Sequence, residues 1–376
     1  MADVTLCTRT EEFGALREEW TRLHRASPTA TPFQTHAWLH SWWLSYGRRG
    51  ALRVVLVRRA GRLVAAAPLM RRLRPAPVLT PLGAGLSDYG DVLADASCPE
   101  ALDDLAAALW THAAAGPVDL REVRPGSAAE ALYDRWPGPR RRLDDSPCLD
   151  LPALPMDDLV GRLPRPRAQR ARAKLRKLDA AGIERRVVTP QEVPGALRRL
   201  LDLHRLQWQQ RKVTTEHLRP RFADHLVRAV TLMAQSGDAH VTEFRLDGEV
   251  VAADLTLRSA RLAGGYLYGA HPGLRERRID VATMLLRSCT EHLHGGDAGP
   301  PGVLSLLRGT EPYKLHWRPE PSVNRRLLLA RRSGTPQLAA LLAEDRARAR
   351  ARTARDAWRA RRTARTAPDA GRDDRP

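Results

Sequence analysis

The chain reads Arg-Arg-Ala-Gly-Arg-Leu-Val-Ala-Ala-Ala-Pro-Leu at residues 58–69 and, 187 positions later, Arg-Leu-Asp-Gly-Glu-Val-Val-Ala-Ala-Asp-Leu-Thr at 245–256. Upstream of these stretches, Gly-Ala-Leu-Arg at 14–17 returns at 195–198. Two blocks that match in the same order at nearly the same offset indicate a duplicated domain. The alternative is a pair of unrelated hairpins that share common residues.

The length of 376 residues leaves room for two domains, each with its own core. We expect a first domain at 1–150, a second at 151–332 and a basic tail, partly helical or disordered, at 333–376. No run of about 18 apolar residues or secretory signal is visible. The four cysteines lie far apart without metal-ligand spacing. This pattern predicts reduced thiols, no metal site and a cytoplasmic protein.

The net charge of +19 is concentrated in two stretches. Residues 159–178 carry eight basic side chains and no acid, and residues 346–365 carry nine arginines against Asp356. Such stretches attract a polyanion, so the tail could contact nucleic acid or an anionic membrane surface. The alternative is a solvated helix whose arginines reflect the composition of the genome.

Periodicity and turn residues predict a mixed α/β fold of two similar units. Helices are expected at 10–25, 35–43, 99–114, 167–181, 193–210, 220–235 and 281–294, with a last helix that begins at Thr335 and fades into the polar end at 368–376. Strands are expected at 52–58, 62–71, 117–123, 239–246, 249–258, 262–269 and 302–307. Residues 136–147 are dense in Pro and Arg, which predicts a surface connection.

The order of strand 262–269, basic loop 271–280 and helix 281–294 is one that can hold a long acyl thioester. The strand's main chain can pair with pantetheine amides, and the helix start offers N–H groups to a pyrophosphate. The alternative is a solvated arginine cluster. The candidate cofactor-binding residues are Tyr266, Leu267, Tyr268, Gly269, Arg275, Arg277, Arg278, Val281 and Ala282.

A second candidate is the stretch Leu-Arg-Gly-Thr-Glu-Pro-Tyr-Lys-Leu-His-Trp at 307–317, which follows an apolar strand. Glu311 could accept a proton from an amine, and Tyr313 could return one to a leaving thiolate. Arg308 or Lys314 could hold an anionic substrate group. The alternative is that these are surface residues, with Tyr313 in the core.

Trp38 belongs to a group of three tryptophans within six residues. Such a group could form a wall of a substrate site, with the core as the alternative.

Four stretches resemble the GNAT-superfamily acetyltransferases of the CelD/BcsL type, which are associated with cellulose or other exopolysaccharide synthesis: Phe-Gln-Thr-His-Ala-Trp at 33–38, Leu-His-Arg-Leu-Gln-Trp at 203–208, the Asp247-Gly248 hairpin and, above all, Leu-Arg-Gly-Thr-Glu-Pro-Tyr-Lys at 307–314. That family is similar to tandem-GNAT proteins such as the Fem-type transferases of cell-wall synthesis. The resemblance implies two tandem GNAT-like domains, the second of which carries the site. It also implies acetyl-CoA or another acyl-CoA as the donor and a small-molecule or sugar amine as the acceptor.

The chain departs from the GNAT pattern at two positions. GNAT proteins usually have Arg-x-x-Gly-x-Gly/Ala in the phosphate loop, whereas Asp280 here replaces the first glycine and adds negative charge. Ser305 replaces an acidic residue that often precedes the Leu-Arg-Gly motif. Two alternatives therefore stay open: a Fem-type enzyme that uses aminoacyl-tRNA, attracted by the basic helix and tail, and an inactive GNAT-like scaffold.

Overall fold

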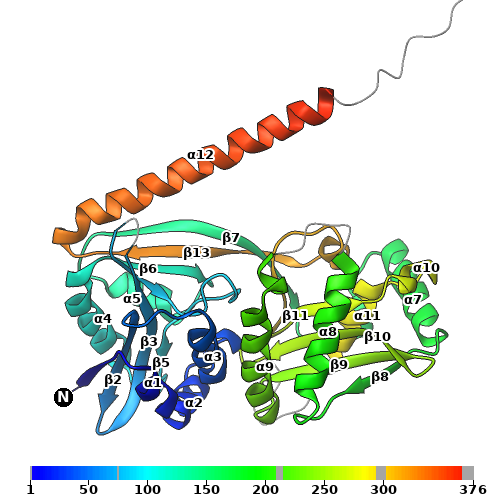
Figure 1. Cartoon of the computed structure of the whole chain (residues 1–376), viewed down its shortest axis with the longest axis horizontal. Coiled ribbons are helices and arrows are strands. Elements are labelled where there is room, and N and C mark those ends of the chain that lie inside the picture. Colours follow the sequence, from blue (N-terminus) through cyan, green and yellow to red (C-terminus); the bar gives the residue numbers. More distant parts are fainter. Residues whose placement is uncertain (1, 74–75, 209–214, 294–301, 366–376) are drawn as a thin grey trace, which may run out of the picture.

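The computed structural model describes residues 2–73, 76–208, 215–293 and 302–365. A single 13-stranded mixed sheet runs through the molecule, with helices on both faces (Figure 1). The elements of the first half are β1 (Asp3–Cys7), α1 (Thr10–Ala15), α2 (Arg17–Ala26), α3 (His36–Tyr46), β2 (Leu52–Arg59), β3 (Arg62–Arg72), β4 (Val78–Pro81), β5 (Leu93–Ala94), α4 (Ala101–His112), β6 (Val118–Val123), α5 (Ala128–Arg135) and β7 (Arg140–Pro152).

The second half repeats much of this order. Its elements are α6 (Met156–Gly161), α7 (Arg165–Asp179), β8 (Glu184–Val187), α8 (Val193–Trp208), α9 (Pro220–Gln235), β9 (Ala239–Leu246), β10 (Glu249–Arg258), β11 (Leu262–Ala270), α10 (Gly273–Glu276), α11 (Val281–Glu291), β12 (Val303–Arg308), β13 (Glu320–Leu329) and α12 (Thr335–Arg365). The mixed α/β fold expected from the sequence is therefore confirmed.

The strand order is symmetric about the middle of the sheet. It runs β1-β2-β3-β4-β6-β13 and then β7-β12-β11-β10-β9-β8. In each half one parallel pair, β4 with β6 and β11 with β12, interrupts the antiparallel pairing. The last strand of each half inserts into the other half, because β7 pairs with β12 and β13 pairs with β6. The two halves therefore exchange one strand each.

The two stretches of the sequence repeat fall on equivalent hairpins. The turn between β2 and β3 places Ala60 and Gly61 at φ 48° and 74°, and the turn between β9 and β10 places Asp247 and Gly248 at φ 53° and 82°. Positive φ at both central residues matches the twist of the flanking strands, and it favours Gly and Asp at these positions.

The expected surface connection at 136–147 is wrong, because these residues include most of strand β7. Most side chains of β7 before Cys148 are exposed or half-buried, so their charges do not oppose strand formation. The backbone of β7 pairs with β13 along nearly its whole length. The expected domain boundary between residues 150 and 151 falls within β7, and the division into domains stays a prediction.

The first turns of helix α12 pack against the body. Leu338 and Leu341 are buried in a cluster with Val78 and Leu328. Beyond these turns the helix projects from the body (Figure 1). The part of the tail at 366–376 lies outside the described residues. No helix in the described ranges is long and apolar enough to cross a membrane.

Candidate functional site

Strands β11 and β12 separate shortly after they begin, which opens a gap within the sheet of the second half. Their parallel pairing is limited to Leu262 with Val303 and Ala263 with Leu304. Beyond these pairs β11 contains a bulge, because Leu255 and Thr256 of β10 pair with Leu267 and Gly265 and skip Tyr266. A bulge bends a strand and changes the direction of its side chains.

A narrow cavity of about 110 Å³ lies at this gap. Apolar side chains form most of its wall, with a few polar groups among them, as is typical of small-molecule sites. Its lining residues are Asp254, Gly265, Leu267, Tyr268, Ala282, Leu285, Leu286, Cys289, Leu304, Ser305, Leu306, Tyr313 and Lys314.

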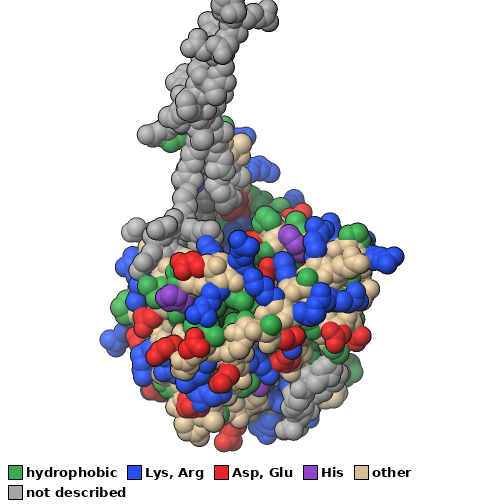
Figure 2. Space-filling view, turned by 90° about the vertical axis from the view of Figure 1, so that its right-hand side faces the viewer, with side chains coloured by type: hydrophobic (Ala, Val, Ile, Leu, Met, Phe, Trp, Pro, Cys, Tyr) green, Lys and Arg blue, Asp and Glu red, His purple; other side chains and the backbone are tan. Residues whose placement is uncertain are grey.

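A wider cavity of about 480 Å³ adjoins the narrow one, since Ala282 and Tyr313 line both. Three cations of α7, namely Arg167, Arg170 and Lys174, lie on its wall. The end of the molecule that carries α7 and α10 faces the viewer in Figure 2, where Lys and Arg side chains cover much of the surface with Asp and Glu between them. The wider cavity thus has a basic wall, whereas the narrow one is mainly apolar.

Asp280 occupies the start of α11, on the wall of the wider cavity. Its carboxylate accepts a hydrogen bond from the Thr283 N–H at 2.8 Å and forms an ion pair with Lys174 at 2.6 Å. Burial disfavours ionisation, but these partners outweigh it and hold the pKa of Asp280 below its usual value. A side-chain carboxylate therefore stands at the helix start, where a phosphate would be stabilised.

Lys314 and Glu311 close the loop that follows β12. The buried Lys314 Nζ donates to the Arg308 main-chain oxygen at 2.8 Å and lies 2.7 Å from a Glu311 carboxylate oxygen. Gly309 has φ 100°, and a Cβ at this position would approach the same carboxylate to 2.6 Å. Lys314 lines the narrow cavity, but its charge is already engaged within the loop.

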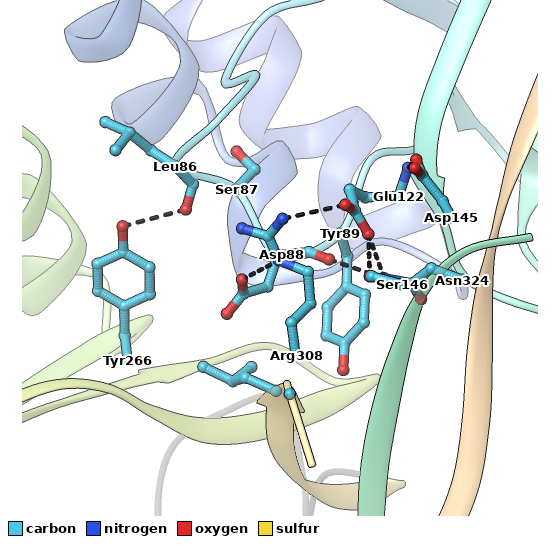
Figure 3. Close-up of polar contacts among 12 residues, drawn as sticks. Leu86, Ser87, Asp88, Tyr89, Glu122, Asp145, Ser146, Tyr266, Arg308 and Asn324 are labelled. Carbon is cyan, nitrogen blue, oxygen red and sulfur yellow. Dashed lines mark hydrogen bonds and ion pairs between the residues drawn. The ribbon is translucent and has the colours of Figure 1, made fainter. Parts of the chain in front are cut away.

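Arg308, predicted to hold an anionic substrate group, instead joins the two halves of the molecule (Figure 3). Its Nε donates to Asp88 at 2.5 Å and its Nη1 donates to Glu122 at 3.0 Å. The amide nitrogen of Asn324 donates to Glu122 at 2.9 Å and to the main-chain oxygen of Asp88 at 3.0 Å. The guanidinium is therefore neutralised by two carboxylates of the first half. Burial by itself lowers the pKa of Arg308, but the two carboxylates outweigh it and raise that pKa above its usual value.

Among the described residues, Tyr266, Gly269 and Trp38 do not line either of the two cavities. The Tyr266 hydroxyl donates to the main-chain oxygen of Leu86 in the first half at 3.0 Å (Figure 3). Trp38 is fully buried, and its Nε1 donates to Ser87 at 3.0 Å. Gly269 packs against the backbone of α8 with no room for a Cβ. The structure thus places Trp38 in the core between the halves, which matches the alternative considered for it.

The predicted phosphate arginines lie on α10 and the turn after it. Arg275, Arg277 and Arg278 are absent from the walls of both cavities within the described residues, as is Val281. Arg277 faces Asp247 at 3.8 Å instead. The predicted residues that do meet at the cavities are Leu267, Tyr268, Ala282, Tyr313 and Lys314.

Tyr313 lies at the border between the cavities. Although 45% of the residue is exposed, loss of water around the phenol raises its pKa, and the neighbouring Tyr268 and Glu311 act in the same direction. The hydroxyl therefore stays protonated at neutral pH and is available as a donor.

Sequence reasoning missed Asp254, which lines the narrow cavity. Only 2% of this residue is exposed, and burial raises the pKa of its carboxyl to about 7. A signal was present, because Asp254 is the single charged residue within the run Val-Val-Ala-Ala-Asp-Leu-Thr-Leu at 250–257. A charge within an otherwise apolar strand is unusual enough to mark a site.

The chain is similar to known proteins in part of its sequence and in its fold. Residues 165–315 match the family model of the acetyltransferase (GNAT) domain. Among solved structures, the chain is similar to a conserved protein of unknown function from Bacteroides thetaiotaomicron VPI-5482 (TM-score 0.59, 12% identity, 88% of this chain and 100% of that chain). It is also similar to FemX, with a TM-score of 0.58 and 11% identity over 90% of this chain and 99% of that chain. L-PGS from Bacillus licheniformis is similar with a TM-score of 0.53 and 13% identity over 90% of this chain and 96% of that chain.

At these identities the likeness to solved structures shows the fold alone. A search of the curated proteins finds no significant match. The expected GNAT-type domain is therefore confirmed for residues 165–315, and the CelD/BcsL type stays a prediction.

Proposed function

We propose that the chain is an N-acyltransferase that moves an acyl group from acyl-CoA to an amine acceptor. The observation that carries this proposal is that the two cavities adjoin and share Ala282 and Tyr313 in their walls. A narrow, mainly apolar space suits an acyl thioester, and a wider space with a cationic wall suits the phosphates of CoA. The acceptor would be a small molecule or a sugar amine, in polysaccharide or cell-envelope metabolism by resemblance, and the place of action would be the cytoplasm.

The cations of α7 would neutralise the phosphates of the donor. Arg167, Arg170 and Lys174 lie on the wall of the wider cavity, next to the first turn of α11. The edge of β11 beyond Ala263 has no β12 partner in the described pairing, so its main chain could bind the amides of the donor's arm. N–H groups of the same edge would stabilise negative charge on the carbonyl oxygen during transfer. Tyr313 would return a proton to the leaving thiolate.

Turnover of acetyl-CoA tests this function. Release of free thiol should be followed with a panel of amines that includes an amino sugar and an amino acid. Thiol release that depends on the amine is expected. Absence of CoA binding at millimolar concentration would overturn the acyl-CoA proposal.

Asp280 favours a second candidate, an inactive GNAT-like scaffold. Its carboxylate already occupies the start of α11 and pairs with Lys174, so a phosphate would have to compete with it. For the inactive scaffold, Asp280→Gly should raise CoA affinity by more than tenfold from nothing measurable in the parent. Measurable turnover by the unmodified protein would exclude the scaffold.

A Fem-type transferase that uses aminoacyl-tRNA is a third candidate, favoured by the basic wall of α7 and the FemX-like fold. Such a donor would bring many phosphates to the surface shown in Figure 2. Co-purifying tRNA that survives a wash of about 0.5 M salt would support it, because purely ionic contacts weaken steeply with salt.

A further inference from the structure

A buried carboxylate lies in the middle of the sheet that carries the narrow cavity. Asp254 stands on β10 between Thr242 of β9 and Tyr268 of β11. The Thr256 hydroxyl donates to it at 3.0 Å and the Ser288 hydroxyl at 3.4 Å. No ion pair of Asp254 is found in the part of the chain that the structure describes.

The Thr242 hydroxyl also helps to lower the pKa of the carboxyl, but burial outweighs all three hydroxyls. Such an environment is costly for a carboxylate, because hydroxyl groups replace water only in part. An asparagine would also form two hydrogen bonds here without carrying a charge, because its amide oxygen would accept from one hydroxyl and its NH2 group would donate to the other. A purely structural role therefore gives no reason for an acid at this position. Buried acids with perturbed pKa values in cavities are candidates for functional groups.

Other titratable groups lie around Asp254 on the neighbouring elements. The titratable and charged groups near Asp254 are, element by element, Arg185 on β8, His240 on β9, Tyr268 on β11, Cys289 on α11, His292 directly after α11, and Tyr313 and Lys314 on the loop after β12. Burial raises the pKa of Cys289 to about 12, and burial lowers the pKa of His292 to about 3. The ammonium of Lys314 is held by Glu311.

We propose that the Asp254 carboxylate is the proton acceptor of the acyl transfer and acts inside the narrow cavity. This inference rests on the function proposed above. The carboxylate takes one proton from the acceptor ammonium, and the freed amine forms a C–N bond to the thioester carbonyl carbon. The C–S bond then breaks with its electron pair on sulfur. The second proton of the nitrogen replaces the one that Tyr313 gives to the thiolate, so that an amide and a thiol result.

Glu311, the acceptor predicted from the sequence, is less suited to this step. Its side chain is 52% exposed, already pairs with Lys314 at 2.7 Å, and is not among the described residues that line either cavity. A carboxylate whose burial raises its pKa to about 7 is matched to proton transfer at neutral pH. The active form is the ionised one, so the rate should rise with pH through that value.

The pH dependence of kcat/KM for acetyl-CoA-dependent thiol release tests the proposal, with the amino sugar or amino acid that the panel identifies. Asp254→Asn should lower kcat/KM at pH 8 by roughly 10²-fold or more and abolish the acidic limb of the profile, with binding of acetyl-CoA unchanged. Thr256→Val removes a hydrogen bond that stabilises the carboxylate. The Thr256→Val variant should therefore keep the acidic limb of the pH profile, with the midpoint of that limb moved to higher pH.

Asp91 provides a matched control. Burial raises the pKa of its carboxyl to about 7 as well. The Asp91 side chain, however, packs against the N-terminal end of α5 and accepts hydrogen bonds from the main-chain N–H groups of Val92 and Ala129 at 2.8 Å. Asp91→Asn should lower thermal stability and leave the acidic limb in place.

Each outcome decides a different point. An acidic limb retained by Asp254→Asn, or a limb unmoved in Thr256→Val, would overturn the assignment while leaving the acyl transfer itself standing. Absence of thiol release by the unmodified protein would overturn the proposed function and the inference with it. If Asp254→Asn does not fold, the assignment of Asp254 is decided by the midpoint of the acidic limb in the Thr256→Val variant.

Discussion

Tyr313 is the residue on which the proposed chemistry can be tested with the smallest change. It lines both cavities, and its raised pKa keeps the phenol protonated. Tyr313→Phe should lower kcat by on the order of 10²-fold with little change in KM, because the hydroxyl acts on the leaving thiolate and not on substrate binding. Steady-state kinetics with acetyl-CoA measure this effect. An unchanged kcat at saturating substrate would reject the role.

The raised pKa of Asp254 also leads us to expect that the free energy of unfolding depends on pH, whether or not the protein is active. Burial raises its pKa from 3.8 to about 7 in the folded protein. Between these values the folded state keeps a proton that the unfolded state has lost, so stability falls as pH rises from about 4 to 7. The loss is on the order of 4 kcal/mol at most, since one pKa unit corresponds to about 1.4 kcal/mol.

Asp254→Asn removes this loss, so the variant should gain stability relative to the unmodified protein at pH 8 but not at pH 4. Denaturant unfolding at both values measures the difference. Equal effects at the two values would show that Asp254 ionises as it does in the unfolded chain.

At the scale of elements, the loop after β12 depends on partners in the other half. Arg308→Gln leaves Asp88 and Glu122 without their shared cation. Because both ion pairs of Arg308 are only partly exposed, the free energy of unfolding should fall by about 2 kcal/mol. Turnover should fall by about tenfold through displacement of Tyr313. Arg325→Gln is the control, since its ion pair with Asp144 is more exposed and should contribute about 0.5 kcal/mol or less.

Urea unfolding and steady-state kinetics of both variants make this comparison. If the two substitutions have equal effects, the contact between Arg308 and the first half does not hold the loop.

At the scale of the whole molecule, the tail divides at residue 345. Its first turns belong to the folded body, because Leu338 and Leu341 are buried and Asp345 pairs with Arg326 and Arg121. Removal of residues 346–376 should leave the unfolding temperature unchanged. Removal of 337–376 should cost on the order of 4 kcal/mol, since two leucines lose their burial.

The same pair of truncations tests the proposed role of the arginines. Loss of 346–376 should weaken retention on anionic vesicles or on a nucleic-acid column at low salt, and it should leave acyl transfer intact. Unchanged retention would indicate that the arginines of the tail are solvated and serve no attachment.

The sequence by itself determined the features that are encoded locally. Apolar periodicity located helices such as α8, α9 and α11, and the residues Ala60-Gly61 and Asp247-Gly248 located two hairpin turns, because turn geometry depends on a few adjacent residues. The stretch at 307–317 was also found, since its residue types and its place after a strand are visible in the chain.

Only the tertiary structure decided how these elements combine. The strand exchange through β7 and β13 could not be predicted, because β7 carries charged side chains and receives its pairing from a strand far along the chain. Arg308 meets Asp88 across 220 positions. Asp254 looks like one acid among many until the strands of the sheet and α11 enclose it. Burial and charge pairing depend on which distant residues pack together, and that is a property of the fold and not of the local sequence.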